Sequence, residues 1–266
     1  AGVDVQKDRL ECSLVAWGNG EEGWLLDHEI FPGDTATPGP WEDLDEYLRD
    51  TRVAMVCVDA GYNTSMAMAF CDGKRWSLPT KGVTGMGRPL IEDERRRKMR
   101  LRVRRKKGQP IEPLGVDQAK SLIYARLKLP TPGPGYLHFP ADPAFDDEYF
   151  AQLAAEQLVK RIRGSRVFSE WKQIRPRNEA LDCLILALAA CRLAGPLATG
   201  PSTPPDSSTA GRADGKAQDA DLPLPSDSSH VVAAAEASAS TTAADTAAKV
   251  FAAMMAARAA KSRVRR

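Results

Sequence analysis

Three aspartates lie in apolar surroundings where a carboxylate is costly unless something compensates for its charge. Asp4 lies within a short apolar run near the start of the chain, and Asp59 ends a second apolar run. Asp182 belongs to a segment, residues 179–194, that is apolar on almost every helical face, and a helix of that kind is buried. Because a buried carboxylate needs an ionic partner or a metal ion, these three positions suggest a functional site.

The chemistry that three converging carboxylates support is metal-dependent hydrolysis. Carboxylates brought together raise one another's pKa unless cations lie between them. Mg²⁺ and Mn²⁺ accept oxygen ligands from a few carboxylates and keep water in their remaining positions. Two such ions about 4 Å apart can activate a water molecule and stabilise the leaving oxygen of a phosphodiester. We therefore expect Asp4, Asp59 and Asp182 to be both the catalytic residues and the metal ligands. Together they would bind two ions of Mg²⁺ or Mn²⁺.

Each aspartate also has a purely structural interpretation. Asp4 and Asp59 could simply adjoin turns at strand ends, where aspartate is common. Asp182 could pair with an arginine that is distant in the sequence. No Lys or Arg lies three or four residues from it, however, and Glu179, one turn earlier, adds negative charge. The conjunction of three such aspartates favours a site more strongly than any one of them.

The elements that must position these residues predict a mixed α/β domain. Apolar runs at 2–5, 10–17 and 24–31, joined by short turns, predict an antiparallel meander. The near-continuous apolar run 53–58 predicts a central strand that is buried on both faces. The expected helices are 41–48, 64–71, 118–127, 146–163 and 178–193, and a further short strand is expected at 75–78.

A basic segment between residues 95 and 107 contains ten cations and no acid. These are Arg95, Arg96, Arg97, Lys98, Arg100, Arg102, Arg104, Arg105, Lys106 and Lys107. Apolar and basic residues alternate from Met99, and a turn at 107–109 would lead into 111–116, so we expect a basic β-hairpin. Several phosphate contacts would make DNA binding salt-dependent and insensitive to base sequence. A solvated hairpin or a disordered loop is the alternative.

The overall composition is that of a globular protein, with 43% hydrophobic and 27% charged residues. The net charge of +2 argues weakly against a nucleic-acid partner, but the concentration of cations in one segment argues for one. Five cysteines without a C-x-x-C motif and three scattered histidines do not suggest a disulfide framework or a thiolate or histidine metal site. No apolar run approaches the ~18 residues of a transmembrane helix, so we expect no membrane partner.

The composition changes near Gly195 and predicts three parts. Residues 1–195 are enough for one domain with a core. Residues 196–230 are rich in Pro, Ser and Asp, and we expect them to be a disordered linker. Residues 231–266 are Ala-rich with a basic end and predict a tail helix, the alternative being a frayed terminus. Because the chain starts without Met directly in a strand-like run, we expect it to be a fragment of a larger protein.

The order of the predicted elements is that of the ribonuclease-H-like fold, and short segments resemble the large terminase subunit of tailed phages, in its lambda-like branch. The resemblance lies in Gly-Val-Asp-Val-Gln at 2–6, Val-Asp-Ala-Gly-Tyr at 58–62 and Arg-Asn-Glu-Ala-Leu-Asp at 177–182. Residues 31–34 and 138–140 look like further family segments. The segment at 177–182 is the most specific of these, and the resemblance covers roughly residues 1–195.

The resemblance implies a function, a site and partners. The family pairs an N-terminal packaging ATPase with a C-terminal nuclease that cuts concatemeric viral DNA. Since this chain lacks a G-x-x-x-x-G-K-[ST] loop, we expect the nuclease part and no ATP site. Asp4, Asp59 and Asp182 would be the metal-binding acids, with Glu179 and Asp34 in supporting roles.

The expected partners are double-stranded DNA, the procapsid portal protein through the C-terminal tail, the terminase small subunit and the ATPase domain, all in the host cytoplasm. Two other functions stay open at this point. The chain could be a non-catalytic module that docks the packaging motor on the portal. It could also be a transposase or recombination nuclease with the same fold. Lys120 could approach the acids from the helix 118–127, although a surface lysine is the ordinary interpretation.

Overall fold

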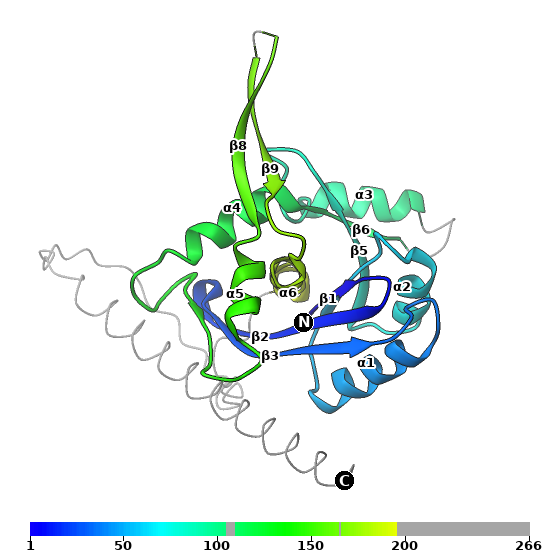
Figure 1. The fold of residues 1–266 in the computed structure, drawn as a ribbon. Helices are drawn as coiled ribbons and strands as arrows, with labels where there is room; N and C mark the ends of the chain where they lie inside the picture. The colour runs from blue at the N-terminus through cyan, green and yellow to red at the C-terminus, as the bar shows by residue number, and fades with distance from the viewer. Residues whose placement is uncertain (105–109, 165, 196–266) are drawn as a thin grey trace, which may run out of the picture.

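A seven-stranded mixed sheet with helices on both faces forms the body of the protein (Figure 1). The computed structural model describes residues 1–104, 110–164 and 166–195. The predicted linker (196–230) and tail helix (231–266) lie outside the described residues. The strand order in the sheet is β6-β5-β4-β1-β2-β3-β7.

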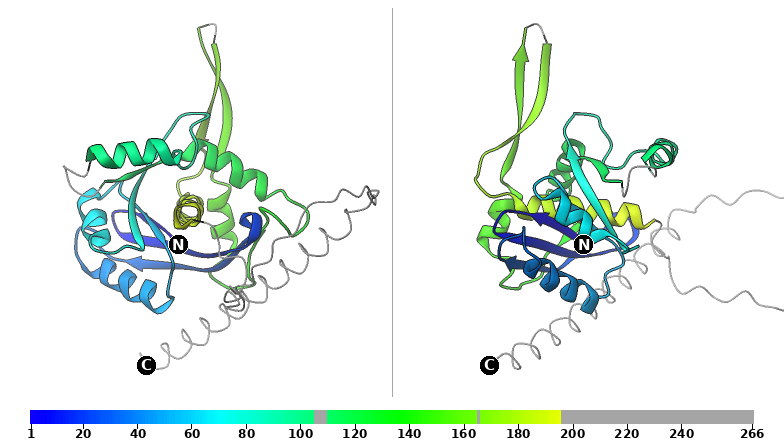
Figure 2. Two further views of the ribbon diagram at one scale, coloured as in Figure 1. Left: turned by 180° about the vertical axis from the view of Figure 1, so that it is seen from behind. Right: turned by 90° about the vertical axis from the view of Figure 1, so that its right-hand side faces the viewer.

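The elements have the following bounds. The sheet contains β1 (Gly2–Val5), β2 (Arg9–Trp17), β3 (Gly23–Pro32), β4 (Val56–Asp59), β5 (Ser77–Val83), β6 (Glu112–Gly115) and β7 (Leu137–His138). The helices are the 3₁₀ turn η1 (Asn19–Glu21), α1 (Gly39–Asp50), α2 (Thr64–Cys71), α3 (Glu94–Arg104), α4 (Val116–Arg126), α5 (Asp147–Leu153) and α6 (Glu179–Ala194). A separate ribbon of β8 (Glu156–Arg163) and β9 (Arg166–Gln173) projects from the body (Figures 1 and 2). None of the helices within the described ranges is both long and apolar enough to cross a membrane.

The antiparallel meander expected at the start of the chain is confirmed. β1 pairs antiparallel with β2, and β2 pairs antiparallel with β3. On its other side β1 pairs in parallel with β4, where Val3 lies opposite Val58. β5 and β6 continue the parallel half of the sheet. The pairing direction therefore changes at β1, which places the first strand of the chain near the centre of the sheet.

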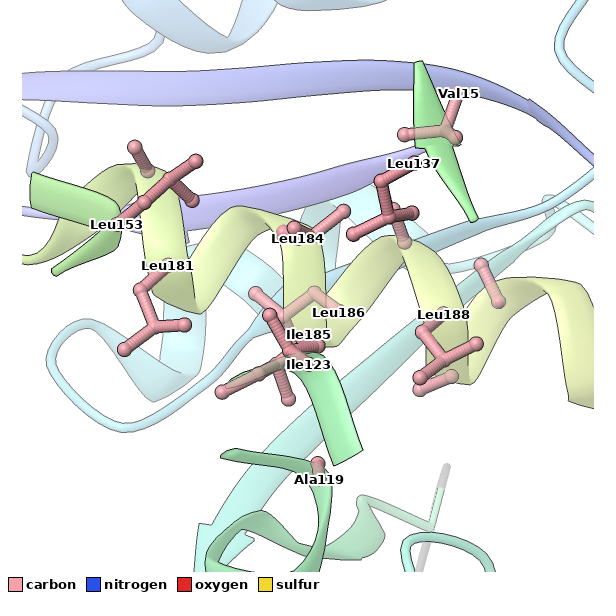
Figure 3. Packing of buried hydrophobic residues seen from close by; sticks show 14 of the residues in the cluster. Val15, Ala119, Ile123, Leu137, Leu153, Leu181, Leu184, Ile185, Leu186 and Leu188 are labelled. Atoms are coloured by element: carbon pink, nitrogen blue, oxygen red, sulfur yellow. The ribbon is translucent and has the colours of Figure 1, made fainter. Parts of the chain in front are cut away.

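The alternation of side chains along the strands builds two cores, one on each face of the sheet. Val3, Leu10 and Val58 point to one face, where α1 and α2 cover them. The opposite face is covered by α4, α5 and α6, and Figure 3 shows Leu184 and Ile185 of α6 in this second core. Asp4 follows Val3 and Asp59 follows Val58, so the same alternation directs both carboxylates to the face covered by α6.

Helix α6 approaches β1 closely because Gly2 has no side chain. A Cβ atom at Gly2 would lie 2.5 Å from the Ala187 nitrogen and closer still to the Cys183 oxygen. The Cys183 thiol also donates a hydrogen bond to the Glu11 carbonyl of β2 at 3.1 Å. Most of α6 is buried, which explains why its sequence is apolar almost all round. All five cysteines are free, as expected.

The basic β-hairpin predicted from residue 99 is wrong, because residues 94–104 form helix α3. The Asp93 carboxylate accepts a hydrogen bond from the Arg96 nitrogen at 2.9 Å and so caps the start of this helix. Lys98 and Glu94, one turn apart, form an ion pair at 2.6 Å. Arg and Lys are good helix formers, and these local interactions outweigh the apolar–basic alternation. The expected return strand exists as β6, but it pairs in parallel with β5.

The single helix predicted over 146–163 is also wrong. Helix α5 ends at Leu153, and β8 begins at Glu156. The chain then reverses near Gly164, whose φ of 60° suits a tight hairpin turn. The apolar residues Leu158 and Ile162 are four positions apart, a spacing that fits a helix as well as one face of a strand.

Candidate functional site

The structure brings Asp4, Asp59 and Asp182 together, and we call these three residues the acid cluster. Asp4 and Asp59 come from the parallel neighbours β1 and β4, and Asp182 lies in the first turn of α6 above them. Their electrostatic coupling shows their proximity, since the charges of Asp182 and Asp59 both raise the pKa of Asp4. Within the described residues no Lys or Arg forms an ion pair with any of the three.

Asp4 is the most strongly perturbed member of the acid cluster. Its side chain is buried, and this burial together with the charge of Asp182 raises its pKa to about 8. The Gln6 side chain opposes the shift, because its Nε2 donates a hydrogen bond to Asp4 Oδ2 at 2.6 Å. Asp4 therefore holds a proton near neutral pH unless a cation comes close.

The other two aspartates are also shifted upward. Burial raises the pKa of Asp182 to about 7, although the positive charge of Lys120 pulls the pKa down. Burial likewise raises the pKa of Asp59, against a hydrogen bond from the Gly61 nitrogen to Asp59 Oδ2 at 3.1 Å. A Cβ atom at Gly61 would lie 2.9 Å from that same oxygen, so glycine keeps this backbone N–H accessible to the carboxylate.

Three residues near Asp182, namely Lys120, Glu156 and Asn178, were not assigned to the site from the sequence. Lys120 Nζ contacts both carboxylate oxygens of Glu156 at 2.7 Å. Asn178 Nδ2 then donates to Glu156 Oε1 at 3.1 Å and to Asp182 Oδ2 at 3.0 Å. Lys120 is thus largely buried next to the acids, and the surface-lysine interpretation is wrong. Glu156 was missed because it fell in the middle of the incorrectly predicted helix.

A second group of charged residues lies next to the acid cluster, and we call it the arginine network. It consists of Arg9, Glu11, Arg177 and Glu179. Arg9 Nε and Arg177 Nη2 contact Glu11 Oε1 at 2.5 and 2.7 Å, and both arginines also pair with Glu179. Burial alone would raise the pKa of Glu11, but His28 and the two arginines outweigh burial and lower it.

Glu179 connects the two groups. Its carboxylate is held by Arg9 and Arg177, yet its charge still raises the pKa of Asp4 and Asp182. The structure therefore places this predicted supporting residue beside the acid cluster. Asp34, the other predicted supporting residue, is exposed in the turn after β3 and accepts a hydrogen bond from the Ala36 nitrogen at 3.0 Å. Its described contacts are local to that turn.

The predicted DNA-binding cations lie mainly on α3, and part of their charge is already compensated. Arg96 pairs with Asp93 at 3.3 Å, Arg97 with Glu112 at 3.2 Å, and Lys98 with Glu94. Arg95 is exposed at the start of the helix. The remaining members divide into Arg100, Arg102 and Arg104, whose backbone belongs to α3, and Arg105, Lys106 and Lys107, which lie outside the described residues.

The donor chemistry of the acid cluster fits a hard divalent cation. All three side chains offer oxygen ligands, and their raised pKa values show that they need positive charge to ionise together. In the part of the chain that the structure describes, no group of three or more His, Cys, Asp and Glu side chains forms a ready-made cage for an ion. Mg²⁺ is usually held by one or two carboxylates together with waters and substrate phosphates, so pairs of these aspartates suit it.

Comparison with known proteins identifies related sequences. The family model described as the terminase large subunit gpA endonuclease domain matches residues 1–199. The chain is 33% identical over 211 residues to the terminase large subunit of Escherichia phage lambda and 32% identical over 214 residues to that of Enterobacteria phage P21. Each match covers 73% of this chain and 32% of the relative, so the chain spans about a third of the length of these relatives. No solved structure matches the chain.

Proposed function

We propose that this chain, which belongs to the family of terminase large subunit endonuclease domains, is a metal-dependent endonuclease that hydrolyses phosphodiester bonds of double-stranded, concatemeric viral DNA during genome packaging. The observation that carries this proposal is the acid cluster. Three carboxylates from β1, β4 and α6 are electrostatically coupled, their pKa values are raised, and the nearby arginines are engaged by other acids, which supports the proposal. Family membership disfavours a transposase or recombination nuclease.

The strand arrangement supports a ribonuclease-H-like classification. An antiparallel meander, β3-β2-β1, continues into the parallel strands β4 and β5 on the other side of β1. Two acids come from the neighbouring strands β1 and β4, and the third comes from a late helix that crosses them. This is the arrangement that the order of elements in the sequence predicts.

Asp4, Asp59 and Asp182 would hold Mg²⁺ or Mn²⁺, most simply as two ions. When bound, these ions would supply water activation and charge stabilisation at the leaving oxygen. The chain itself orients the carboxylates: Gln6 Nε2 donates to Asp4, the Gly61 nitrogen to Asp59 and Asn178 Nδ2 to Asp182. Such outer hydrogen bonds fix the orientation of metal ligands, and losing one typically costs about 10–100-fold in metal affinity or activity.

The cations of α3 would contribute phosphate contacts without base recognition, which suits an enzyme that acts on a long duplex. Because the chain spans about a third of the length of its relatives, the remaining partners are proposals only. They are the portal protein, reached through residues 231–266, the terminase small subunit and an ATPase domain, acting in the host cytoplasm.

Single-turnover cleavage of plasmid DNA with Mn²⁺ or Mg²⁺ tests the nuclease proposal. We expect Asp182→Asn and Asp4→Asn to reduce the cleavage rate at least about 100-fold, because each removes an essential charge from the acid cluster. Asp43→Asn is the matched control, since Asp43 is exposed on α1. Undiminished cleavage by both cluster variants would overturn the assignment.

The portal-docking proposal is tested separately by deleting residues 231–266. We expect the truncated chain to cut DNA at the same rate and to lose binding to portal rings in a pull-down assay. Retained portal binding by the truncated chain would show that the tail is not the docking element.

A further inference from the structure

The β8–β9 ribbon stands apart from the seven-stranded sheet and extends beyond the helices in every view (Figures 1 and 2). Its two strands form an unbroken antiparallel ladder from Glu156 opposite Gln173 at the root to Arg163 opposite Arg166 near the tip. A two-stranded ribbon of this kind has little stability of its own in water. Its length and its projection therefore suit an element that contacts a partner.

One face of the ribbon carries an apolar pair near its tip, separated from a second apolar pair by Lys160 and Ser169. The register places Leu158 opposite Trp171 and Ile162 opposite Val167, and side chains two residues apart share a face. Ile162 is 77% exposed and Val167 is 66% exposed, so this pair is presented to solvent at the far end of the ribbon. Apolar residues at the tip of a projecting arm indicate a contact surface.

The ribbon is also strongly basic. Between residues 156 and 175 there are six Lys or Arg and two acids. Both acids are already paired, Glu156 with Lys120 of α4 and Glu170 with Arg161 at 2.6 Å. Lys160, Lys172 and Arg175 are exposed, and this excess of positive charge suits a polyanion.

The root of the ribbon is attached directly beside the acid cluster. Tyr124 stacks on Trp171 with ring centroids 5.0 Å apart, and its hydroxyl accepts a hydrogen bond from the Glu156 nitrogen at 3.1 Å. The Trp171 indole donates to the Asp117 carbonyl at 3.0 Å. Glu156 is linked through Asn178 to Asp182. A duplex held by the ribbon would therefore lie close to the acids.

We propose that the β8–β9 ribbon is a DNA-binding arm of the nuclease. Its exposed cations contact phosphates, and its apolar tip, Ile162 and Val167, enters a groove of the duplex. A groove of B-DNA admits a two-stranded ribbon, and apolar side chains at such tips can wedge between base steps. This arm rests on the proposed nuclease function for its substrate, and it adds a binding element that is distinct from α3.

Fluorescence anisotropy with a labelled 30-base-pair duplex of mixed sequence, in titrations at several salt concentrations, tests the arm. The full chain carries Asp182→Asn throughout, so that the probe stays intact. We expect Lys160→Gln with Lys172→Gln to weaken binding about tenfold and to reduce the salt slope by about 2, because two phosphate contacts are lost. We expect Ile162→Ser with Val167→Ser to weaken binding while the salt slope stays unchanged.

The matched control is Arg49→Gln with Lys128→Gln, which removes two exposed cations, one on α1 and one in the turn after α4. Thermal melts establish that each variant is folded. Unchanged affinity in both ribbon variants would overturn the arm and indicate that the ribbon contacts a protein. Because binding is measured without cleavage, failure of the arm leaves the nuclease proposal intact. If the ribbon variants weaken DNA binding as expected but the wild-type chain does not cleave plasmid DNA, the nuclease proposal is refuted instead.

Discussion

The acid cluster and the arginine network lie next to each other on one face of the sheet, yet their carboxylates behave oppositely. Asp4 lies directly opposite Glu11 across β1 and β2, and both side chains are buried under α6. The pKa of Asp4 is raised to about 8, whereas the pKa of Glu11 is lowered. Asp4 is 5% exposed and Glu11 is 0% exposed, so both are largely removed from solvent. Burial alone therefore does not distinguish a structural acid from a functional one; the available cations do.

The largest expected contrast is between removing a carboxylate charge from the acid cluster, which should affect cleavage, and removing one from the arginine network, which should affect stability. Asp4→Asn should abolish cleavage, with a loss of at least about 100-fold, and should leave the protein as stable or more stable because it relieves repulsion in the acid cluster. Glu11→Gln should lower the free energy of unfolding, because it leaves Arg9 and Arg177 without their shared partner. Cleavage assays and urea unfolding of the same samples measure both effects. A destabilised Asp4→Asn variant would contradict the comparison.

Arg9→Met tests the arginine network from the cationic side. It removes a partner from both Glu11 and Glu179. We expect a loss of about 3 kcal/mol in the free energy of unfolding, the usual cost of breaking a buried ion pair. Arg49→Met is the control, because it breaks an exposed pair with Asp45 and should cost less than about 1 kcal/mol. Equal losses in the two variants would show that the network is not structurally special.

The acid cluster and the arginine network should also change the free energy of unfolding in opposite directions as the pH rises. The pKa values of Asp4 and Asp182 are raised in the folded state, so the folded protein binds more protons than the unfolded chain and loses stability as pH rises from about 4 to 8. The pKa of Glu11 is lowered, so its contribution is lost as pH falls through the acidic range. Urea unfolding between pH 3 and 9 measures both effects. We call the loss of stability with rising pH the alkaline limb and the loss with falling pH the acidic limb.

Two additions sharpen this pH experiment. Asp4→Asn should flatten the alkaline limb and leave the acidic limb unchanged. Mn²⁺ at pH 8 should raise the melting temperature of the wild type more than that of Asp182→Asn, because binding to the folded state stabilises it. If the alkaline limb is the same in Asp4→Asn and Asp182→Asn as in the wild type, the acid cluster does not cause it.

Lys120→Met should have the smallest effect, because Lys120 belongs to neither group and neutralises Glu156 beside them. Its removal leaves the charge of Glu156 without its partner and raises the pKa of Asp182. We expect the cleavage rate to fall by about tenfold, equivalent to one charged hydrogen bond, with its pH profile displaced to higher pH. Lys120→Arg should restore most of the activity. An unchanged pH profile in Lys120→Met would remove Lys120 from the site.

The acids of the cluster were predictable because their signals are local. Asp4 and Asp59 each follow an apolar residue at the point where strand alternation turns them to the other face, and Asp182 interrupts an apolar helix. The arginine network gives no such signal, since Arg9 and Glu179 are 170 residues apart and Arg177 and Glu11 are 166 apart. Only the packing of α6 across β1 and β2 brings these pairs together.

The errors in the fold arose where one pattern fits two structures. Met99, Leu101 and Val103 alternate with arginines as in a strand, but the Asp93 cap and the Glu94–Lys98 pair favour the helix α3. Leu158 and Ile162 have helical spacing, yet they lie on one face of β8. In both regions the decisive interactions involve ends and turns, which periodicity does not report.

The contact between Gly2 and α6 has a consequence for the order in which the protein is made. Asp4 lies in β1, at the beginning of the sheet's sequence, and Asp182 lies in the last helix that covers it. A ribosome must therefore synthesise nearly the whole domain before the third acid can reach the other two. Incomplete translation products that end before α6 therefore cannot assemble the acid cluster.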